Sequence, residues 1–568
     1  MNDSKNMILA VVLSALVLLG WSWAANKYFP TANPPAAKVE NGKTQALPQP
    51  QAQPGTPSTP AALRNRAVVL GSTPRVRIDT PSLQGSINLK GAQIDDLTLV
   101  RQRETIAKDS PAVRLLSPLG APGAYVASFG WTAQGAPAPT LDTMWSADNS
   151  TLSPGHPVTL STQAADGIRY EMKIAVDDGY LFTVEQRVVN GSAAPVTVRP
   201  IGLVSRATKS ADPDTWTNHV GPIGVFDGKA NYDVNWKDLD EKGASSFGNV
   251  GGWLGFTDKY WLTALVPQGG MNGEFRHSPS GGYQADYDLS GAAVAPGQTL
   301  ATSTKLFAGA KEKDFLDRYE KAGIPKLTKA IDWGWFEWFM RPIFGLLIFL
   351  FHTLRNFGFA IIALTLIVRG ILFPIAQKQF QSMAAMRKLQ PKMKAIQERF
   401  KDDKQRQQQE ILKLYQEEKV NPAAGCLPIL LQIPVFYALY KVLLVSVEMR
   451  HQPFIGWIKD LSAPDPLTPI NLFGLLNFTP PTFLHIGILP ILVGCTQWLS
   501  MKLNPQPMDP AQAQVFAIMP WVLIFVFAPF AAGLQLYWIT NNVLTIAQQW
   551  WLYRKYGLHF ADTHPVHT

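Results

Sequence analysis

Apolar runs long enough to cross a bilayer limit how this chain of 568 residues can fold. The first run covers residues 7–25, and further runs begin near residue 343 and continue to residue 551. A membrane-spanning helix needs about 20 mostly apolar residues. The stretch from about residue 70 to residue 310 has instead the composition of a water-soluble domain. The sequence therefore predicts a multi-domain, α-helical integral membrane protein with a large soluble insert.

The run at residues 7–25 allows two interpretations. Ser22 and Ala24 form the small-x-small pattern of a signal peptide cleavage site. However, the run is longer than a signal core of about 7 to 15 residues, and Trp21 and Trp23 resemble interfacial anchors. We therefore predict an uncleaved first span, followed by a disordered, Pro-rich tether over residues 26–67 that has too few large apolar side chains to form a core.

Residues 68–310 are predicted to form an all-β sandwich. Short alternating segments such as RVRID (75–79) and YEMKIAV (170–176) are separated by Gly, Pro, Asn and Asp, without amphipathic helices between them. The aromatic stretch GGWLGFTDKYWLTALV (251–266) could line a ligand groove, but we interpret it as buried core with a turn at Asp258. The chain's two cysteines lie outside this domain, so a disulfide framework is excluded there.

The C-terminal half is predicted to form a helical core of five further spans. Charged residues interrupt the apolar pattern of residues 311–356, so we expect one helix outside the membrane and one interfacial helix there. The spans are expected at residues 357–374, 425–447, 483–501, 514–528 and 533–551. The basic insert at 375–424 carries apolar residues at three- and four-residue steps, which predicts a helical hairpin. The apolar face of this hairpin includes Met383, Met386, Leu389 and Met393.

Basic residues cluster at one side of the predicted spans and so set the orientation. Because basic segments favour the cytoplasm, the hairpin, the N-terminus (1–6), the loop 502–513 and the tail 552–568 are expected inside. The β-domain, the loop 448–482 and the turn 529–532 are then outside. The sequence predicts six spans with both termini in the cytoplasm.

Signatures of enzymatic chemistry are lacking in the sequence. The nine histidines are scattered, and the motifs HExxH and GxSxG and a Gly-rich phosphate loop are missing. Carboxylates of the β-domain such as Asp95, Asp177 and Glu185 are explained by turns and exposed strand faces. We therefore expect no catalytic residues, no metal site and no cofactor.

Arg369 stands out in the predicted span 357–374, because an arginine at a helix centre costs about 2.5 to 3.5 kcal/mol on insertion scales. It could snorkel past Pro374 to the interface. The five C-terminal spans contain no Asp or Glu, which leaves water, backbone carbonyls, acids of the hairpin or an arriving chain as partners. Polar residues in several spans suggest a shared wet interior. These residues are Thr365, Gln432, Gln497, Gln535, Thr540, Asn541 and Asn542.

Three segments carry a resemblance to a known family. They are IVRGILFP (367–374), KLQPKMKAIQERFKDDKQRQQQEILKLY (388–415) and VNPAAGCLPILLQIPVFYALY (420–440). In their order and predicted topology, the chain resembles the YidC/Oxa-type membrane protein insertases in their Gram-negative bacterial form. The resemblance implies a bacterial inner membrane protein whose periplasmic domain is a β supersandwich.

The same resemblance implies an insertase and chaperone that inserts, folds and assembles integral membrane proteins, alone or with the Sec translocon. Nascent chains and the lipid bilayer are the implied partners, with the ribosome as a further one, and no nucleic acid is recognised directly. The resemblance places Arg369 and Thr365 in a cytoplasm-open, hydrophilic groove. Trp538 stands where many relatives carry a tyrosine, with Tyr537 beside it. We add Gln432 and Asn541 to this groove for their polarity.

Two other functions stay open from the sequence. A small-solute secondary transporter would usually show an internal repeat with matching broken helices, which we do not detect. An enzyme acting on periplasmic polysaccharide would place its activity in the β-domain, so truncation of that domain would distinguish it from an insertase.

Overall fold

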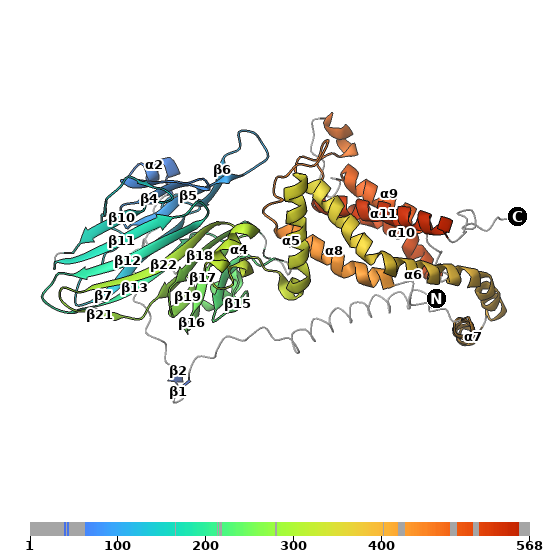
Figure 1. Ribbon diagram of the computed structural model, residues 1–568, viewed down its shortest axis with the longest axis horizontal. Coiled ribbons are helices and arrows are strands. Elements are labelled where there is room, and N and C mark those ends of the chain that lie inside the picture. The colour runs from blue at the N-terminus through green and yellow to red at the C-terminus, as the bar shows by residue number, and fades with distance from the viewer. Residues whose placement is uncertain are drawn as a thin grey trace.

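The computed structural model describes residues 39–40, 43–44 and 63–555, except 165, 213, 215–217, 279–280, 402, 419–426, 477–485 and 504–509. The predicted first span, the N-terminus and most of the tether and tail lie outside these residues. Figure 1 shows a β-domain at one end of an elongated molecule and a helical core at the other. Within the tether, β1 (Val39–Glu40) pairs with β2 (Lys43–Thr44), and α2 (Arg66–Leu70) begins at its end.

The β-domain consists of two large sheets. In the nine-stranded sheet the order is β15-β14-β17-β18-β22-β12-β11-β10-β8. Its strands are β8 (Ser146–Ala147), β10 (Val158–Gln163), β11 (Ile168–Val176), β12 (Leu181–Asn190), β14 (Gly221–Phe226), β15 (Lys229–Asn231), β17 (Gly252–Thr257), β18 (Trp261–Pro267) and β22 (Thr299–Ala310).

The second sheet has eleven strands, and its order is β16-β19-β20-β13-β7-β5-β4-β3-β9, with β21 on β13 and β6 on β5. Its strands are β3 (Arg75–Asp79), β4 (Leu83–Asn88), β5 (Gln93–Arg103), β6 (Ala112–Leu116), β7 (Tyr125–Gln134), β9 (Thr151–Leu152), β13 (Val196–Arg206), β16 (Ala244–Val250), β19 (Met271–His277), β20 (Tyr283–Asp288) and β21 (Ala292–Val294). Helix α3 (Trp236–Lys242) is the short helix inside this domain.

Alternation of side chains builds this sandwich. On β11, Ile168, Tyr170 and Met172 are buried while the residues between them are not, because successive side chains of a strand point to opposite faces. The predicted segment RVRID coincides with β3, and the last strand ends at Ala310, where the sequence predicts the end of the domain. The predicted β-sandwich is confirmed.

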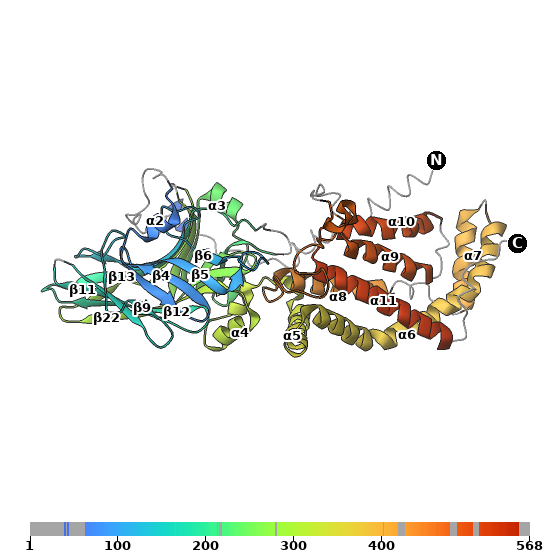
Figure 2. The same ribbon diagram turned by 90° about the horizontal axis from the view of Figure 1, so that it is seen from above.

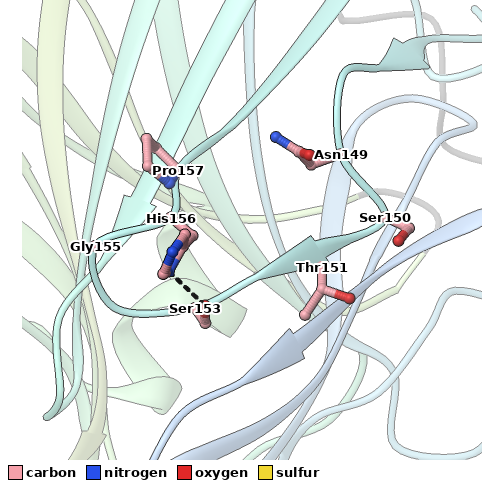
Figure 3. A pocket seen from close by; sticks show the side chains of 7 residues that line it. All are labelled: Asn149, Ser150, Thr151, Ser153, Gly155, His156 and Pro157. Atoms are coloured by element: carbon pink, nitrogen blue, oxygen red, sulfur yellow. Dashed lines mark hydrogen bonds between the residues drawn. The ribbon is translucent and has the colours of Figure 1, made fainter.

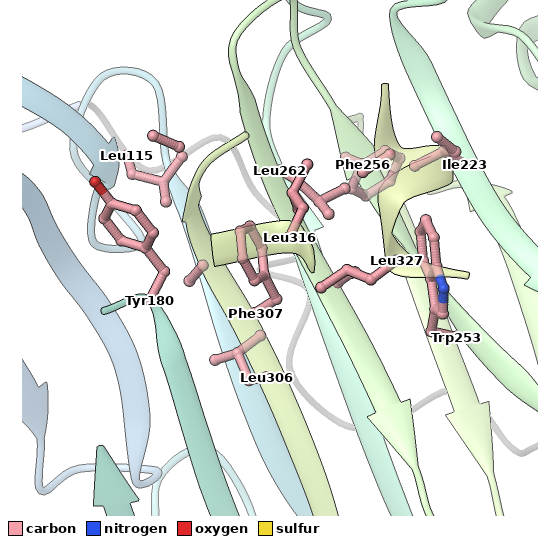
Figure 4. Close-up of a cluster of buried hydrophobic side chains, with 14 of the residues drawn as sticks. Leu115, Tyr180, Ile223, Trp253, Phe256, Leu262, Leu306, Phe307, Leu316 and Leu327 are labelled. Carbon is pink, nitrogen blue, oxygen red and sulfur yellow. The ribbon is translucent and has the colours of Figure 1, made fainter. Parts of the chain in front are cut away.

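The aromatic stretch 251–266 is buried core, as predicted. It forms the antiparallel pair β17 and β18, and Trp253 and Phe256 are fully buried. Figure 4 shows Leu316 of α4 (Lys313–Lys321) and Leu327 of η1 (Leu327–Ala330) against the same cluster. The helix after the last strand is thus packed on the β-domain.

The core contains seven helices among the described residues. They are α5 (Glu337–Leu354), α6 (Phe357–Arg399), α7 (Lys404–Glu417), α8 (Leu427–Val445), α9 (Ile488–Leu503), α10 (Pro510–Phe527) and α11 (Ala532–Lys555). Two short 3-10 helices, η2 (Gly334–Phe336) and η4 (Pro469–Gly474), precede α5 and α9. By length and hydropathy, two described stretches could cross a membrane, Glu337–Leu354 and Phe357–Lys378, and three shorter helices are apolar.

The sequence predicts that a membrane span ends at residue 374 and that a separate hairpin begins at residue 375, but α6 continues through this boundary. It runs unbroken for 43 residues through Pro374 and Pro391, so the predicted span and the first hairpin helix are one element. A proline removes one backbone hydrogen bond, yet the flanking turns keep theirs and the helix continues. At 1.5 Å per residue this helix is about 65 Å long, roughly twice the thickness of a bilayer core.

The hairpin packs through a small apolar cluster between α6 and α7. Leu389 and Met393 of α6 are buried against Leu414 of α7, with Ile396 and Ile411 at the margin. Leu412 of α7, two residues before Leu414, is 57% exposed. The side chains of Met383 and Met386 lie outside the described ones.

Candidate functional site

Arg369 projects from α6 onto α11 and is half-buried. Its Nε donates to Oδ1 of Asn541 at 2.8 Å, and Nη2 donates to the carbonyl oxygen of Asn541 at 3.3 Å. Nη2 also donates to the hydroxyl of Thr545. Among the described side chains, these hydrogen-bond partners of Arg369 are neutral, so its charge is solvated by dipoles and not cancelled by an anion.

Helix geometry explains this arrangement. Asn541 and Thr545 are four residues apart and therefore lie on one face of α11. The hydroxyl of Thr545 donates to the carbonyl of Asn541 at 2.7 Å, which fixes both groups where the guanidinium reaches them. Thr545 is absent from the predicted site, although its spacing from Asn541 is a signal that the sequence contains. We call Arg369, Asn541 and Thr545 the arginine cluster.

Thr365 lies one helical turn before Arg369 on α6. It is 1% exposed, and its hydroxyl donates to the carbonyl of Ile361 at 2.7 Å. A threonine hydroxyl that donates to the preceding turn in this way has its hydrogen-bond donor paired within its own helix. Thr365 is therefore close to the arginine cluster in the chain but turned toward its own helix.

Trp538 of α11 belongs to a separate contact that joins four helices. Its indole Nε1 donates to Oε1 of Gln497 on α9 at 3.2 Å. Its ring lies 5.0 Å from the ring of Phe436 on α8 and 4.9 Å from that of Phe527 on α10. The neighbouring Tyr537 is buried. The side chain of Gln432 lies outside the described ones.

Other polar residues of α11 connect helices and turns. Asn542 donates to the hydroxyl of Thr496 on α9 at 3.1 Å, and Gln535 donates to the carbonyls of Phe527 and Phe530 at 2.9 and 2.7 Å. Such bonds between neighbouring helices are the common role of polar side chains in membrane proteins. The grouping of these residues around one wet interior stays a prediction.

Lys441 is a second cation in the core, and the sequence interpretation overlooks it. It lies within α8, is 1% exposed, and its Nζ is 3.4 Å from Oδ2 of Asp332. Asp332 belongs to the segment between η1 and η2 that enters the core from the β-domain. The carboxylate of this pair comes from outside the predicted spans, so their composition alone does not indicate it.

The β-domain contains a shallow pocket of about 530 Å³, lined by Asn149, Ser150, Thr151, Ser153, Gly155, His156 and Pro157. Figure 3 shows Ser153 beside His156, with Oγ 3.4 Å from Nδ1. The two residues exchange backbone hydrogen bonds across a tight turn, which accounts for their proximity. Within the described part of the chain, no group of three or more His, Cys, Asp or Glu could hold a metal ion.

Family models match both halves of the chain. The model described as "60Kd inner membrane protein" matches residues 349–558, and that described as "YidC periplasmic domain" matches residues 75–346. "Membrane protein insertase YidC" of Zymomonas mobilis is 47% identical over 98% of this chain and 96% of that relative. The chain belongs to the YidC family of membrane protein insertases.

Further YidC relatives are similar over the same length. The proteins of Methylorubrum extorquens and Rhizobium meliloti, both named membrane protein insertase YidC, are 43% identical over 98% of this chain, and the match covers 96% and 97% of them. The two family matches meet inside α5, so the β-domain and the helical core correspond to the two parts of a YidC protein. This family is not a class of catalytic enzymes.

Proposed function

We propose that this protein inserts, folds and assembles integral membrane proteins in the bacterial inner membrane, alone or with the Sec translocon and the ribosome as partners. The observation that carries the proposal is the match to YidC insertases over nearly the whole chain. The arginine cluster gives this function a physical centre, because its charge lies in the helical core with neutral partners. A small-solute transporter is not supported by these relatives.

The proposed topology has six spans, a periplasmic β-domain and a cytoplasmic hairpin. Cation–π pairs support it: Lys502 lies 4.0 Å from the ring of Trp498, and Arg554 lies 4.0 Å from that of Trp550. Lysine, arginine and tryptophan together are typical of a membrane interface. Figures 1 and 2 place the hairpin and these ends of α9 and α11 on the side away from the β-domain.

Helix α5 is proposed to lie in the periplasmic interface. It runs across the direction of α11 in Figure 1 and is seen almost end-on in Figure 2. Its first turns carry Trp338, which is 71% exposed, together with Glu337 and Arg341. An amphipathic helix of this kind suits the boundary between headgroups and acyl chains better than a crossing of the membrane.

In the proposed mechanism, the arginine cluster lowers the barrier for a hydrophilic segment of the client. The guanidinium attracts acidic groups of this segment, since a charge in a medium of low dielectric constant acts strongly on another charge. When the client's apolar segment moves into lipid, burial at about 25 cal/mol per Å² drives the reaction forward. The reaction requires no covalent chemistry and no cofactor.

The test uses protein in liposomes and a client with one span and a short acidic tail. Arg369→Ala should reduce insertion of this client about tenfold or more, and Arg369→Lys should retain most of it, since an effect of about 1.4 kcal/mol corresponds to a factor of ten. A client with a neutral tail is the control and should respond less to Arg369→Ala. Equal insertion of the acidic client by wild type and Arg369→Ala would remove the proposed role of the charge.

The β-domain is proposed to support this activity without carrying it. Deletion of residues 68–310 should leave most insertion by the helical core, because the arginine cluster lies wholly in α6 and α11. An enzyme acting on periplasmic polysaccharide would instead lose its activity with this domain. Insertion abolished by the deletion, with the helical core still folded by circular dichroism, would contradict the proposal.

A further inference from the structure

We propose that the segment Pro469–Leu476, formed by η4 and the two residues after it, is a membrane anchor that inserts into the outer leaflet beside α9. The proposal rests on the proposed topology, in which this segment faces the periplasm. Its ligand is a lipid surface, and it would fix the loop between α8 and α9 at the bilayer. We call this segment the loop anchor.

Exposure of large apolar side chains is the first observation. Leu472 is 52% exposed, Phe473 53% and Leu475 84%, and Ile470 and Leu476 are exposed as well. Removal of such side chains from water is favourable in proportion to the apolar area that is buried. Five of them within seven residues exceed the single, scattered apolar residues that are normal on a protein surface.

Lack of charge is the second observation, and it favours lipid over water as the surroundings. From residue 466 to residue 501 the sequence contains no Asp, Glu, Lys or Arg. A loop that faced water would need polar side chains to cover its apolar ones, whereas a segment at the acyl boundary is destabilised by charge. The composition of the loop anchor therefore continues that of the membrane helix that follows it.

Attachment to α9 is the third observation. The carbonyl of Leu467 accepts a hydrogen bond from the backbone N–H of Ile488 at 3.1 Å, and Oδ2 of Asp465 accepts one from Leu489 at 2.7 Å. Trp457 donates its indole N–H to Oδ1 of Asp465 at 3.0 Å and is itself 37% exposed. These bonds hold the start of the loop anchor at the first turn of α9, with a tryptophan at the same level, as at a membrane interface.

Continuity with the apolar surface of α9 completes the argument. Leu492, Trp498 and Leu499 are 39%, 42% and 44% exposed along this helix, which belongs to the part of the chain that matches an inner membrane protein. Lipid that contacts α9 would reach the loop anchor without crossing a polar zone. A second protein could also cover these side chains, and the experiment below distinguishes the two.

The experiment places a bimane probe on single cysteines in a Cys426→Ser, Cys495→Ser background, with the purified protein in phosphatidylcholine and phosphatidylglycerol liposomes. The probe positions are Phe473→Cys and Leu475→Cys. Leu492→Cys on α9 is the control for lipid contact, and Met144→Cys, at a β-domain position that is 50% exposed, is the control for water. Brominated lipid and iodide are the two quenchers.

Brominated lipid should quench both loop probes at least about twofold more than the probe at position 144, and iodide should quench them less. Quenching by iodide as strong as at position 144 would overturn the proposal. A probe protected from both quenchers would also overturn it, since it would show a protein contact. Client insertion is measured separately in the same liposomes, so loss of the proposed function and loss of lipid contact are distinguishable.

Discussion

At the scale of single residues, Arg369 and Lys441 are two cations of the helical core that are stabilised in different ways. Arg369 is surrounded by an amide, a carbonyl and a hydroxyl, whereas Lys441 faces the carboxylate of Asp332. Neutral hydrogen-bond partners leave the net charge of a cation in place, so that it can still attract another ion. A carboxylate partner neutralises most of this charge. The first arrangement suits a site that meets an acidic client, and the second suits a fixed contact.

Asn541→Ala should destabilise the protein by about 1.5 to 3 kcal/mol, because it removes one hydrogen-bond acceptor from the half-buried, charged guanidinium of Arg369. Asn542→Ala, one position further on the same helix, should cost about 0.6 kcal/mol, since it breaks a bond between neutral groups. Thermal unfolding in detergent micelles measures both. Equal effects would show that the charge of Arg369 does not strengthen its bond to Asn541.

Asp332→Ala should lower the stability of the helical core by about 3 kcal/mol, because it leaves the buried ammonium of Lys441 without its carboxylate. The double variant Asp332→Leu, Lys441→Leu should recover most of this loss, since well-packed apolar side chains often replace a buried ion pair without cost. The same unfolding measurement applies. If the double variant is no more stable than Asp332→Ala, the contact is not electrostatic.

At the scale of elements, the continuity of α6 connects the hairpin to the arginine cluster. One helix carries Arg369 in its first third and Leu389 and Met393 near its end. A helix is stiff along its axis, so a client that moves the hairpin would also move Arg369 relative to α11. The prolines at 374 and 391 are the points where such a helix would bend.

Leu414→Asp should separate α7 from α6, because it places a charge in the apolar cluster of the hairpin. Leu412→Asp on the same helix is the matched control and should leave the hairpin closed, since this side chain is 57% exposed. Distances between spin labels on α6 and α7 report the separation. Opening of the hairpin by both variants would mean that the cluster does not hold it.

At the scale of the whole molecule, few but specific contacts join the β-domain to the core. The backbone N–H of Lys313 donates to Oε1 of Glu448 at 2.7 Å. Arg450 donates to the carbonyls of Arg103 and Glu104 at 2.6 and 3.2 Å, and its guanidinium lies 5.4 Å from the ring of Trp261. The loop after α8 thus contacts both α4 and the edge of the β-domain.

This junction should weaken as pH rises. Burial raises the pKa of the Glu448 carboxyl from its ordinary 4.5 to about 7, although Lys313 and Ser446 donate hydrogen bonds to it and oppose the shift. The folded state therefore binds more protons than the unfolded state between these values. The stabilisation is complete below pH 4.5 and is lost as pH rises through about 7.

Glu448→Gln should flatten this dependence. We expect the unfolding free energy of wild type to fall by about 1 to 2 kcal/mol more than that of the variant between about pH 5 and about pH 8. Asp109→Asn, an exposed site in the β-domain, is the control and should keep the wild-type slope. A parallel slope for Glu448→Gln would show that this carboxyl does not titrate with folding.

Local pattern and composition were sufficient for much of this protein. Alternation of apolar residues predicts strands such as β3 and β11, because each strand buries one face. The apolar runs likewise predict where α8 to α11 lie, and the basic insert predicts the hairpin. The unusual position of Arg369 is visible in the sequence alone.

Only the tertiary structure decided which groups meet. Asn541 and Thr545 rather than an acid surround Arg369, Trp538 contacts α9 instead of the arginine cluster, and Asp332 reaches Lys441 from a segment about a hundred residues earlier. Hydrophobic periodicity reports which face of an element is buried, but it does not report which element covers that face. Partners of buried polar groups depend on how helices pack, and that packing depends on contacts between residues far apart in the chain.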